Sequence, residues 1–159
     1  MSEVFEYSPQ QVQLIVGGYP LTGWQTIRIA RNAQSFIPIR GIRGKNTRVL
    51  NPDTSATITI PLIQTSQGND VLSQIHELDR QRRTGRLTLT LKDGSGQSVF
   101  SSDEAYITSF PEVGFSGEIE YRTWSFFCQT TTFHVGGNAS PQSGNLLNQI
   151  LGQVGNFFG

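Results

Sequence analysis

Two histidines, one cysteine and a few neighbouring acids are the residues of this 159-residue chain whose chemistry could support catalysis or metal binding. His76 lies beside Glu77 and Asp79, but neither His76 nor His134 has a second ligand four residues away, the spacing at which a helix presents two metal ligands. Cys128 continues the apolar face of a predicted strand, so we expect it to fill space in the core. We therefore expect no catalytic residue, no metal site and no cofactor.

The glycine motifs and one acidic pair do not change this expectation. Gly17-Gly18 and Gly41-x-x-Gly44 are not followed by a helix that starts with Lys-Ser or Lys-Thr, so they do not predict a phosphate-binding loop. Glu118 and Glu120 alternate onto one face of a predicted strand, where cross-strand pairing with arginine is the default interpretation. An enzyme is thus the least favoured interpretation of the sequence.

The elements that would position these residues are clearest between residues 56 and 92. Apolar residues alternate with threonines in residues 56 to 62 and again in residues 87 to 91, the pattern of half-buried strands. Between them apolar residues recur at helical spacing and are followed by arginines and Gly85, which predicts a helix over about 66–83. We expect this helix to cover part of a sheet.

Further strands are predicted at residues 12–16, 26–31, 97–100, 104–110, 118–128 and 130–135, with a turn at residues 93–96. Residues 33 to 53 instead predict a long excursion that is unusual unless it has a use. The expected fold class is mainly β (α+β), an antiparallel β-sandwich or barrel of about eight strands with one helix.

Composition excludes several classes of protein. Charged residues make up 15% of the chain, against ~25% in ordinary domains, and its 12 basic and 12 acidic residues cancel. Because the chain has no net charge, its overall charge is not expected to attract nucleic acid. The acidic N-terminus lacks the features of a secretory signal, and no segment approaches the ~20 apolar residues of a membrane span. A single cysteine agrees with synthesis in a reducing cytosol.

A series of short motifs runs in order through residues 4 to 138. They are Tyr7-Ser8-Pro9, Gly17-Gly18, Leu62-Ile63-Gln64-Thr65-Ser66, Asn69-Asp70-Val71-Leu72, His76, Asp79, Leu91-Lys92-Asp93, Arg122-x-Trp124-x-Phe126 and Val135-Gly136-Gly137-Asn138. In this order they resemble the tail tube proteins of long contractile-tailed bacteriophages, and they are similar to the tube protein of type VI secretion.

The resemblance implies a structural subunit that assembles into hexameric rings, which stack into a tube whose lumen conducts DNA during ejection. The implied partners are further copies of the chain, the tail sheath, baseplate and tail terminator proteins, and a tape measure protein inside the lumen; DNA is only passing cargo, and no membrane is involved. The implied location is the virion tail after synthesis in the host bacterial cytoplasm. A tube protein of a type VI secretion system or of a tail-like bacteriocin is the alternative.

In that family the long loop reaches toward the adjacent ring, which assigns the basic residues of the excursion to ring-to-ring contacts. These residues are Arg40, Arg43, Lys45 and Arg48, and their expected partners are Glu118, Glu120 or Asp103 and Glu104 of the next subunit; a solvated loop is the other interpretation. Because DNA carries one negative charge per ~1.7 Å, the lumen should be neutral or acidic. The candidate lining is Thr57, Thr59, Thr88 and Thr90, although the sequence does not fix which face of the sheet is inward.

The chain is expected to divide into a tube domain (1–135), a linker (136–144) and a C-terminal extension (145–159). From residue 129 onward there is no Asp, Glu, Lys or Arg. The extension is amphipathic at helical spacing and predicts a partner-docking tail that clasps a neighbouring subunit or the surrounding sheath. The other interpretation is that it docks on its own domain or remains mobile. Its apolar residues are Leu146, Leu147, Ile150, Leu151, Val154, Phe157 and Phe158.

Overall fold

A computed structural model describes residues 7 to 137, which form ten strands, one α-helix and a 3-10 turn. The main sheet is antiparallel and eight-stranded, in the order β2-β1-β7-β8-β9-β6-β3, with β10 also paired to β8. The elements are η1 (Pro9–Gln11), β1 (Val12–Val16), β2 (Tyr19–Pro20), β3 (Arg28–Arg31), β4 (Phe36–Arg40), β5 (Asn46–Leu50), β6 (Ala56–Ile63), α1 (Gly68–Arg82), β7 (Leu87–Asp93), β8 (Val99–Ser109), β9 (Tyr121–Cys128) and β10 (Thr131–His134).

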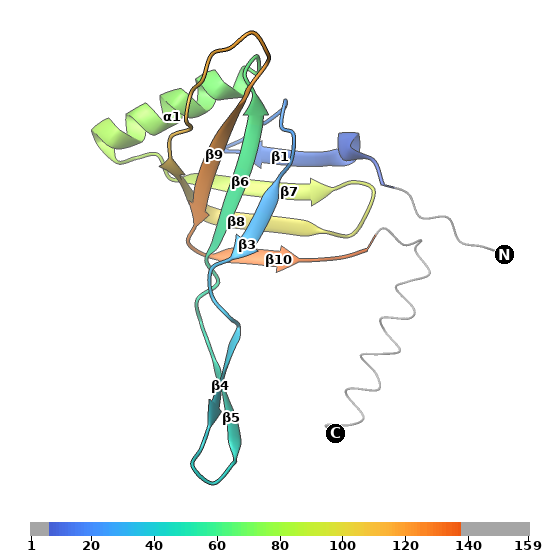
Figure 1. The fold of residues 1–159 in the computed structure, drawn as a ribbon, viewed down its shortest axis with the longest axis vertical. Helices are drawn as coiled ribbons and strands as arrows, with labels where there is room; N and C mark the ends of the chain where they lie inside the picture. Colours follow the sequence, from blue (N-terminus) through green and yellow to red (C-terminus); the bar gives the residue numbers. More distant parts are fainter. Residues whose placement is uncertain (1–6, 138–159) are drawn as a thin grey trace, which may run out of the picture.

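The main sheet curls around its own core. In Figure 1, strands β1, β7, β8 and β10 run across the view, whereas β9, β6 and β3 cross them steeply. One apolar cluster nevertheless takes side chains from both groups, among them Leu14, Leu89, Ile58 and Phe126. The mainly β fold is therefore confirmed, with one helix among residues 7–137, because both groups of strands bury one face against the same core.

Strict alternation explains which face of each central strand is buried. In β6 the residues Ala56, Ile58, Ile60 and Leu62 are fully buried, and every residue between them is half-exposed. Strand β9 repeats the pattern, and the two strands pair in register so that their buried residues lie opposite one another. The predicted core role of Cys128 in β9 is confirmed, since its side chain is fully buried.

Helix α1 is fixed to the sheet by packing and by one polar side chain. Leu72 is fully buried, and the Nε1 of Trp124 donates a hydrogen bond to the Oδ1 of Asn69 at 3.0 Å. The side-chain Nδ2 of Asn69 in turn donates to the carbonyl oxygen of Ile63 at 2.9 Å. The helix begins and ends within two residues of the range predicted for it, which is the ordinary uncertainty of helix boundaries.

Two segments differ from the expectation. The two strands predicted at residues 97–100 and 104–110 are one long strand, β8 (Val99–Ser109), whose first half pairs with β10 and whose second half pairs with β9. The predicted break falls next to the exposed residues Asp103 and Glu104, which a shift in the β7–β8 register accommodates within the strand. Residues 33–53 are an ordered β4–β5 hairpin that forms its own two-stranded sheet and projects away from the main sheet (Figure 1).

The predicted docking tail, Leu146 to Phe158, and all but the first two residues of the predicted linker lie outside the described residues. The division into domain, linker and extension therefore stays a prediction. Within residues 7 to 137, the helix is too short and too polar to cross a bilayer.

Candidate assembly surfaces

The four threonines expected to line a lumen lie on one face of the main sheet, opposite the core. Thr57 and Thr59 alternate with the buried residues of β6, and Thr88 and Thr90 alternate with the leucines of β7. Thr88 and Thr90 are exposed, and the hydroxyl of Thr57 donates to the Oδ1 of Asn32 at 2.8 Å. Since α1 packs into the core, these threonines face away from the helix side.

This open face is rich in hydroxyl groups and balanced in charge. Strand pairing extends the row of Thr90 through Ser101 to Thr132, and the row of Thr59 to Ser125. Basic residues Arg28 and Lys92 share the face, and Asp103 and Glu104 are exposed beside it. The face therefore offers hydrogen bonds without a large charge of either sign.

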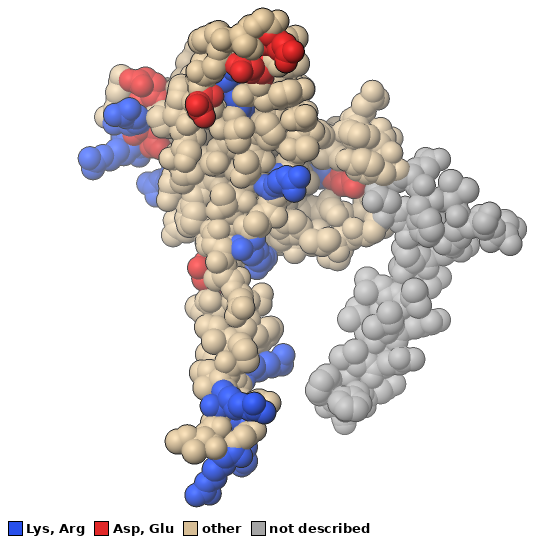
Figure 2. Space-filling view, in the orientation of Figure 1, with Lys and Arg blue, Asp and Glu red and all other residues tan. Residues whose placement is uncertain are grey.

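The basic residues Arg40, Arg43, Lys45 and Arg48 all lie on the β4–β5 hairpin, and all are exposed. The amide of Gly41 donates to the carbonyl oxygen of Lys45 at 2.8 Å, and Gly44 adopts a φ of +84°, which favours glycine, so the tip is a defined turn. Figure 2 shows these side chains as blue patches at the lower end of the molecule.

The hairpin also exposes many apolar side chains, a feature that was not predicted from the sequence. All ten residues of its two strands are exposed, and the side chain of Ile42 at the tip is fully exposed. The guanidinium of Arg48 lies 4.5 Å from the centre of the Phe36 ring, a stacked cation–π geometry. Further exposed apolar residues of the hairpin are Ile37, Ile39, Val49 and Leu50.

An acidic loop at residues 110–120 occupies the opposite end of the molecule, where Figure 2 shows red side chains at the top. Glu112 and Glu118 are exposed, together with the apolar side chains of Phe115 and Ile119. Glu120 differs, because it is half-buried and its Oε2 has no hydrogen-bond partner among the described residues. Glu118 is thus an accessible partner for a cation, whereas Glu120 holds part of its carboxylate inside the loop.

One subunit does not bring the predicted basic and acidic partners together. The hairpin and the acidic loop lie at opposite ends of the long axis (Figures 1 and 2). Any contact between them must join two different copies. The other predicted acidic partners, Asp103 and Glu104, belong to β8 and lie beside the open face instead of at either end.

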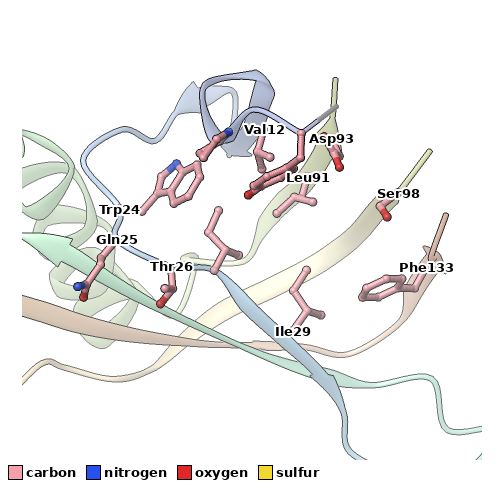
Figure 3. Close-up of a pocket in the computed structure, with 12 residues that line it drawn as sticks. Val12, Trp24, Gln25, Thr26, Ile29, Leu91, Asp93, Ser98 and Phe133 are labelled. Carbon is pink, nitrogen blue, oxygen red and sulfur yellow. The ribbon is translucent and has the colours of Figure 1, made fainter. Parts of the chain in front are cut away.

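An apolar groove of about 430 Å³ lies where the two ends of the curled sheet face each other. Figure 3 shows Val12 and Leu91 on one side, Ile29 on the other, and Trp24 and Phe133 along it. The sequence analysis missed this groove because its lining comes from four separate segments. The strand predicted at residues 26–31, which includes Ile27 and Ile29, was the only signal of it.

The residues with catalytic potential are scattered. His76 packs against Phe110 with ring centres 5.4 Å apart, and His134 is exposed on β10. Burial raises the pKa of the Cys128 thiol to about 11, so the thiol stays protonated and unreactive near neutral pH. Within residues 7–137, no three residues of the metal-ligating types come close enough to hold an ion.

Comparison with known proteins identifies relatives of the chain. It is 35% identical over 157 residues to the structural protein ORF10 of Pseudomonas phage KPP10, an alignment that covers 91% of both chains. No protein-family model matches it.

Solved structures with the same fold come from contractile injection systems and from a phage-like particle. A chain of the anti-feeding prophage cap, which terminates the tube, has a TM-score of 0.63 at 12% identity and covers 85% of this chain and 95% of its own. A chain of the gene transfer agent virion has a TM-score of 0.57 at 13% identity, with 82% and 100% covered. A chain of the sheath-tube complex of an extracellular contractile injection system has a TM-score of 0.53 at 13% identity, with 82% and 92% covered.

These structural likenesses show a shared fold, and the relative in phage KPP10 shows common descent. Together they confirm the resemblance to tail tube proteins and favour a structural role over an enzymatic one. The chain belongs to the family of phage structural proteins that includes ORF10 of phage KPP10, has the fold of tail tube proteins, and is a component of the virion.

Proposed function

We propose that the chain is the tail tube subunit, which closes into hexameric rings that stack head to tail around a lumen that conducts DNA during ejection. The observation that carries the proposal is the separation of the basic hairpin and the acidic loop to opposite ends of one subunit (Figure 2). When two different surfaces of identical copies bind each other, each new copy offers a free surface to the next one. The copies form an open filament unless the rotation between them closes a ring. Such a contact along the long axis builds a tube.

The composition of the two ends supports this stacking. An isolated two-stranded hairpin is at best marginally stable in water, and this one exposes isoleucines as well as cations. The acidic loop presents Phe115 and Ile119 beside Glu112 and Glu118. Arg40, Arg43, Lys45 and Arg48 would pair with these acids, and with Glu120 if its loop opens, while the apolar side chains cover each other. A merely solvated hairpin would gain nothing from its exposed isoleucines.

Ring closure is the second part of the proposal. Strand β3 at one end of the sheet and the β1–β2 hairpin at the other keep unpaired edges within the described residues. Side-by-side pairing of copies would remove such edges. The open face with Thr57, Thr59, Thr88 and Thr90 would then line the lumen, where hydroxyl groups and balanced charge would let DNA and the tape measure protein slide.

A tube terminator or cap is the second candidate, because the anti-feeding prophage chain with this fold belongs to a cap. A terminator needs a stacking surface on one side only, whereas this chain presents complementary surfaces at both ends. A repeating subunit is therefore favoured, with sheath, baseplate and terminator proteins as its partners. The phage relative favours a phage tail over the alternative, a tube of a type VI secretion system or a tail-like bacteriocin.

Negative-stain electron microscopy of the concentrated full-length chain tests the proposal. We expect tubes from the unchanged chain, and unstacked rings with an unchanged melting temperature from Arg43→Glu/Arg48→Glu. Adding Glu112→Arg/Glu118→Arg to that variant exchanges the charges at the substituted positions of the two ends and should restore tubes. Arg80→Glu/Arg82→Glu on the exposed side of α1 is the matched control and should form tubes. Normal tubes from Arg43→Glu/Arg48→Glu, or no assembly of the unchanged chain at any concentration, would overturn the proposal.

A further inference from the structure

The apolar groove between the two ends of the sheet takes no part in the stacking contacts of the proposed tube. Its lining is dominated by Val12, Trp24, Ile29, Leu91 and Phe133, and its volume of about 430 Å³ is in the range of pockets that bind ligands. We propose that this groove is the docking site of the C-terminal segment of the same chain, residues 145–159.

The point at which the chain leaves the described part supports this occupant. The amide of Gly136 donates to the Oγ of Ser98 at 3.1 Å, and the amide of Gln97 donates to the carbonyl oxygen of Gly137 at 3.2 Å. Ser98 itself lines the groove, as does Phe133 three residues before Gly136 (Figure 3). The following residues therefore start at the rim of the groove.

The length of the connection favours the same chain over another copy. Residues 138–144 span on average about 14 Å as a flexible chain, and at most about 23 Å when extended. A segment tethered this close to its site experiences an effective concentration of about a millimolar or more, which a second copy in dilute solution does not reach. Same-chain docking is therefore expected even before assembly.

The chemistry of the two surfaces also matches. Residues 145–159 carry no charge and seven large apolar residues at helical spacing. The groove holds one charged residue, Asp93, whose Oδ1 already accepts hydrogen bonds from the amide and the hydroxyl of Ser95. The N-terminal residues before Tyr7 are the competing occupant, but they include Glu3 and Glu6, whose burial in an apolar groove would be costly.

Disulfide trapping in the full-length chain tests the proposal. Ile29→Cys in the groove combined with Ile150→Cys should form an intrachain disulfide under mild oxidation, visible as a faster-migrating monomer. The control pair is Thr90→Cys with Ile150→Cys, because Thr90 is exposed on the opposite face of the sheet. Cys128 is buried and should not compete. A disulfide between chains, equal trapping in the control pair, or no disulfide with Ile29→Cys would overturn the proposal.

Fluorescence quenching provides a second readout that leaves the groove unaltered. Trp24 lines the groove and is half-exposed, whereas Trp124 is buried in the core, so a soluble quencher reports mainly on Trp24. Ile150→Asp should raise the quenching constant because a charged segment leaves the groove. Asn148→Asp adds the same charge on the polar side of the segment and should leave the constant unchanged. Equal quenching in both variants would contradict the proposal.

Discussion

The main sheet and the β4–β5 hairpin are both antiparallel and both rich in β-branched residues, yet they differ completely in burial. Strand β6 alternates between fully buried and half-exposed residues, whereas all ten strand residues of the hairpin are exposed. Strand pairing and apolar content therefore do not create a core by themselves. A second surface must cover the strands, and residues 7–137 of one subunit do not provide that surface for the hairpin.

Among the described residues, only a few contacts hold the hairpin within its own chain. Its ladder, the turn at Gly41–Gly44 and the stacking of Arg48 on Phe36 are local. At its base the amide of Asn51 donates to the carbonyl oxygen of Ser35 at 2.8 Å. The core lies against the main sheet, which is therefore expected to contribute nearly all of the stability of an isolated subunit, whereas the role proposed for the hairpin is in contacts between subunits.

The largest expected effect is the difference between one substitution in each region. Phe126→Ala removes a fully buried ring from the centre of the core and should lower the free energy of unfolding by about 3 to 5 kcal/mol. Ile39→Ala truncates a hairpin side chain that is 51% exposed and should alter the free energy of unfolding by less than about 0.5 kcal/mol. Denaturant unfolding of the unassembled chain measures both.

The same pair of variants sharpens the comparison when the subunits are assembled. Ile39→Ala should then reduce the yield of stacked rings, because its side chain would be buried between copies. If Ile39→Ala lowered the free energy of unfolding of the unassembled chain by several kcal/mol, the hairpin would have a partner within its own subunit. The difference in burial between the hairpin and the main sheet would then be contradicted.

A smaller difference is expected in the reactivity of thiols placed in the two regions. Burial raises the pKa of Cys128 from 9.0 to about 11, although a hydrogen bond with Ser102 opposes the shift. At about pH 8 its thiolate fraction is therefore lower about a hundredfold than that of an ordinary thiol. A cysteine introduced by Ile39→Cys should react with a thiol reagent at least that much faster, and the two should react alike in denaturant. Equal rates in the folded chain would show that β9 opens readily.

The contrast also explains what the sequence could predict. The alternation in β6, β7 and β9 predicts strands because each has one buried face, and the helical spacing of Leu72 and Ile75 predicts α1 for the same reason. The hairpin has no buried face, so it lacks alternation, and Pro38 with Gly41 and Gly44 indicated an irregular excursion. The register shift that keeps Asp103 and Glu104 within β8 depends on pairing with β7, which local sequence does not encode.

The candidate surfaces were predictable to different degrees. The cluster of cations from Arg40 to Arg48 and the threonine faces are visible as local patterns. The path of the 110–120 loop decides which end of the subunit carries the acids. It also turns part of the Glu120 carboxylate inward, and neither feature is visible in the sequence. The groove requires the curl of the whole sheet, because it brings Ile29 opposite Leu91.

The smallest expected effect lies at the joint between the two regions. Between β5 and β6 the Oδ1 of Asp53 accepts a hydrogen bond from the amide of Ser55 at 2.8 Å, and the amide of Asp53 donates to the Oδ1 of Asn51 at 3.0 Å. The side chain of Asn32 donates to the Oγ of Ser55 at 3.1 Å. These bonds fix the direction in which the hairpin leaves the sheet.

The hydrogen bonds from Ser55 lower the pKa of Asp53 below its ordinary value of 3.8. A carboxylate with a lowered pKa in the folded state stabilises that state above its unfolded pKa, and this contribution is lost as the pH falls through the folded-state value. Asp53→Asn should therefore weaken hydrogen-exchange protection of the Ser55 amide slightly at about pH 6, and the difference from the unchanged chain should vanish below the lowered pKa. Because Asp53 is fully exposed, the global melting temperature should hardly change. A difference that persisted in strong acid would mean that the charge of Asp53 is not what protects the Ser55 amide.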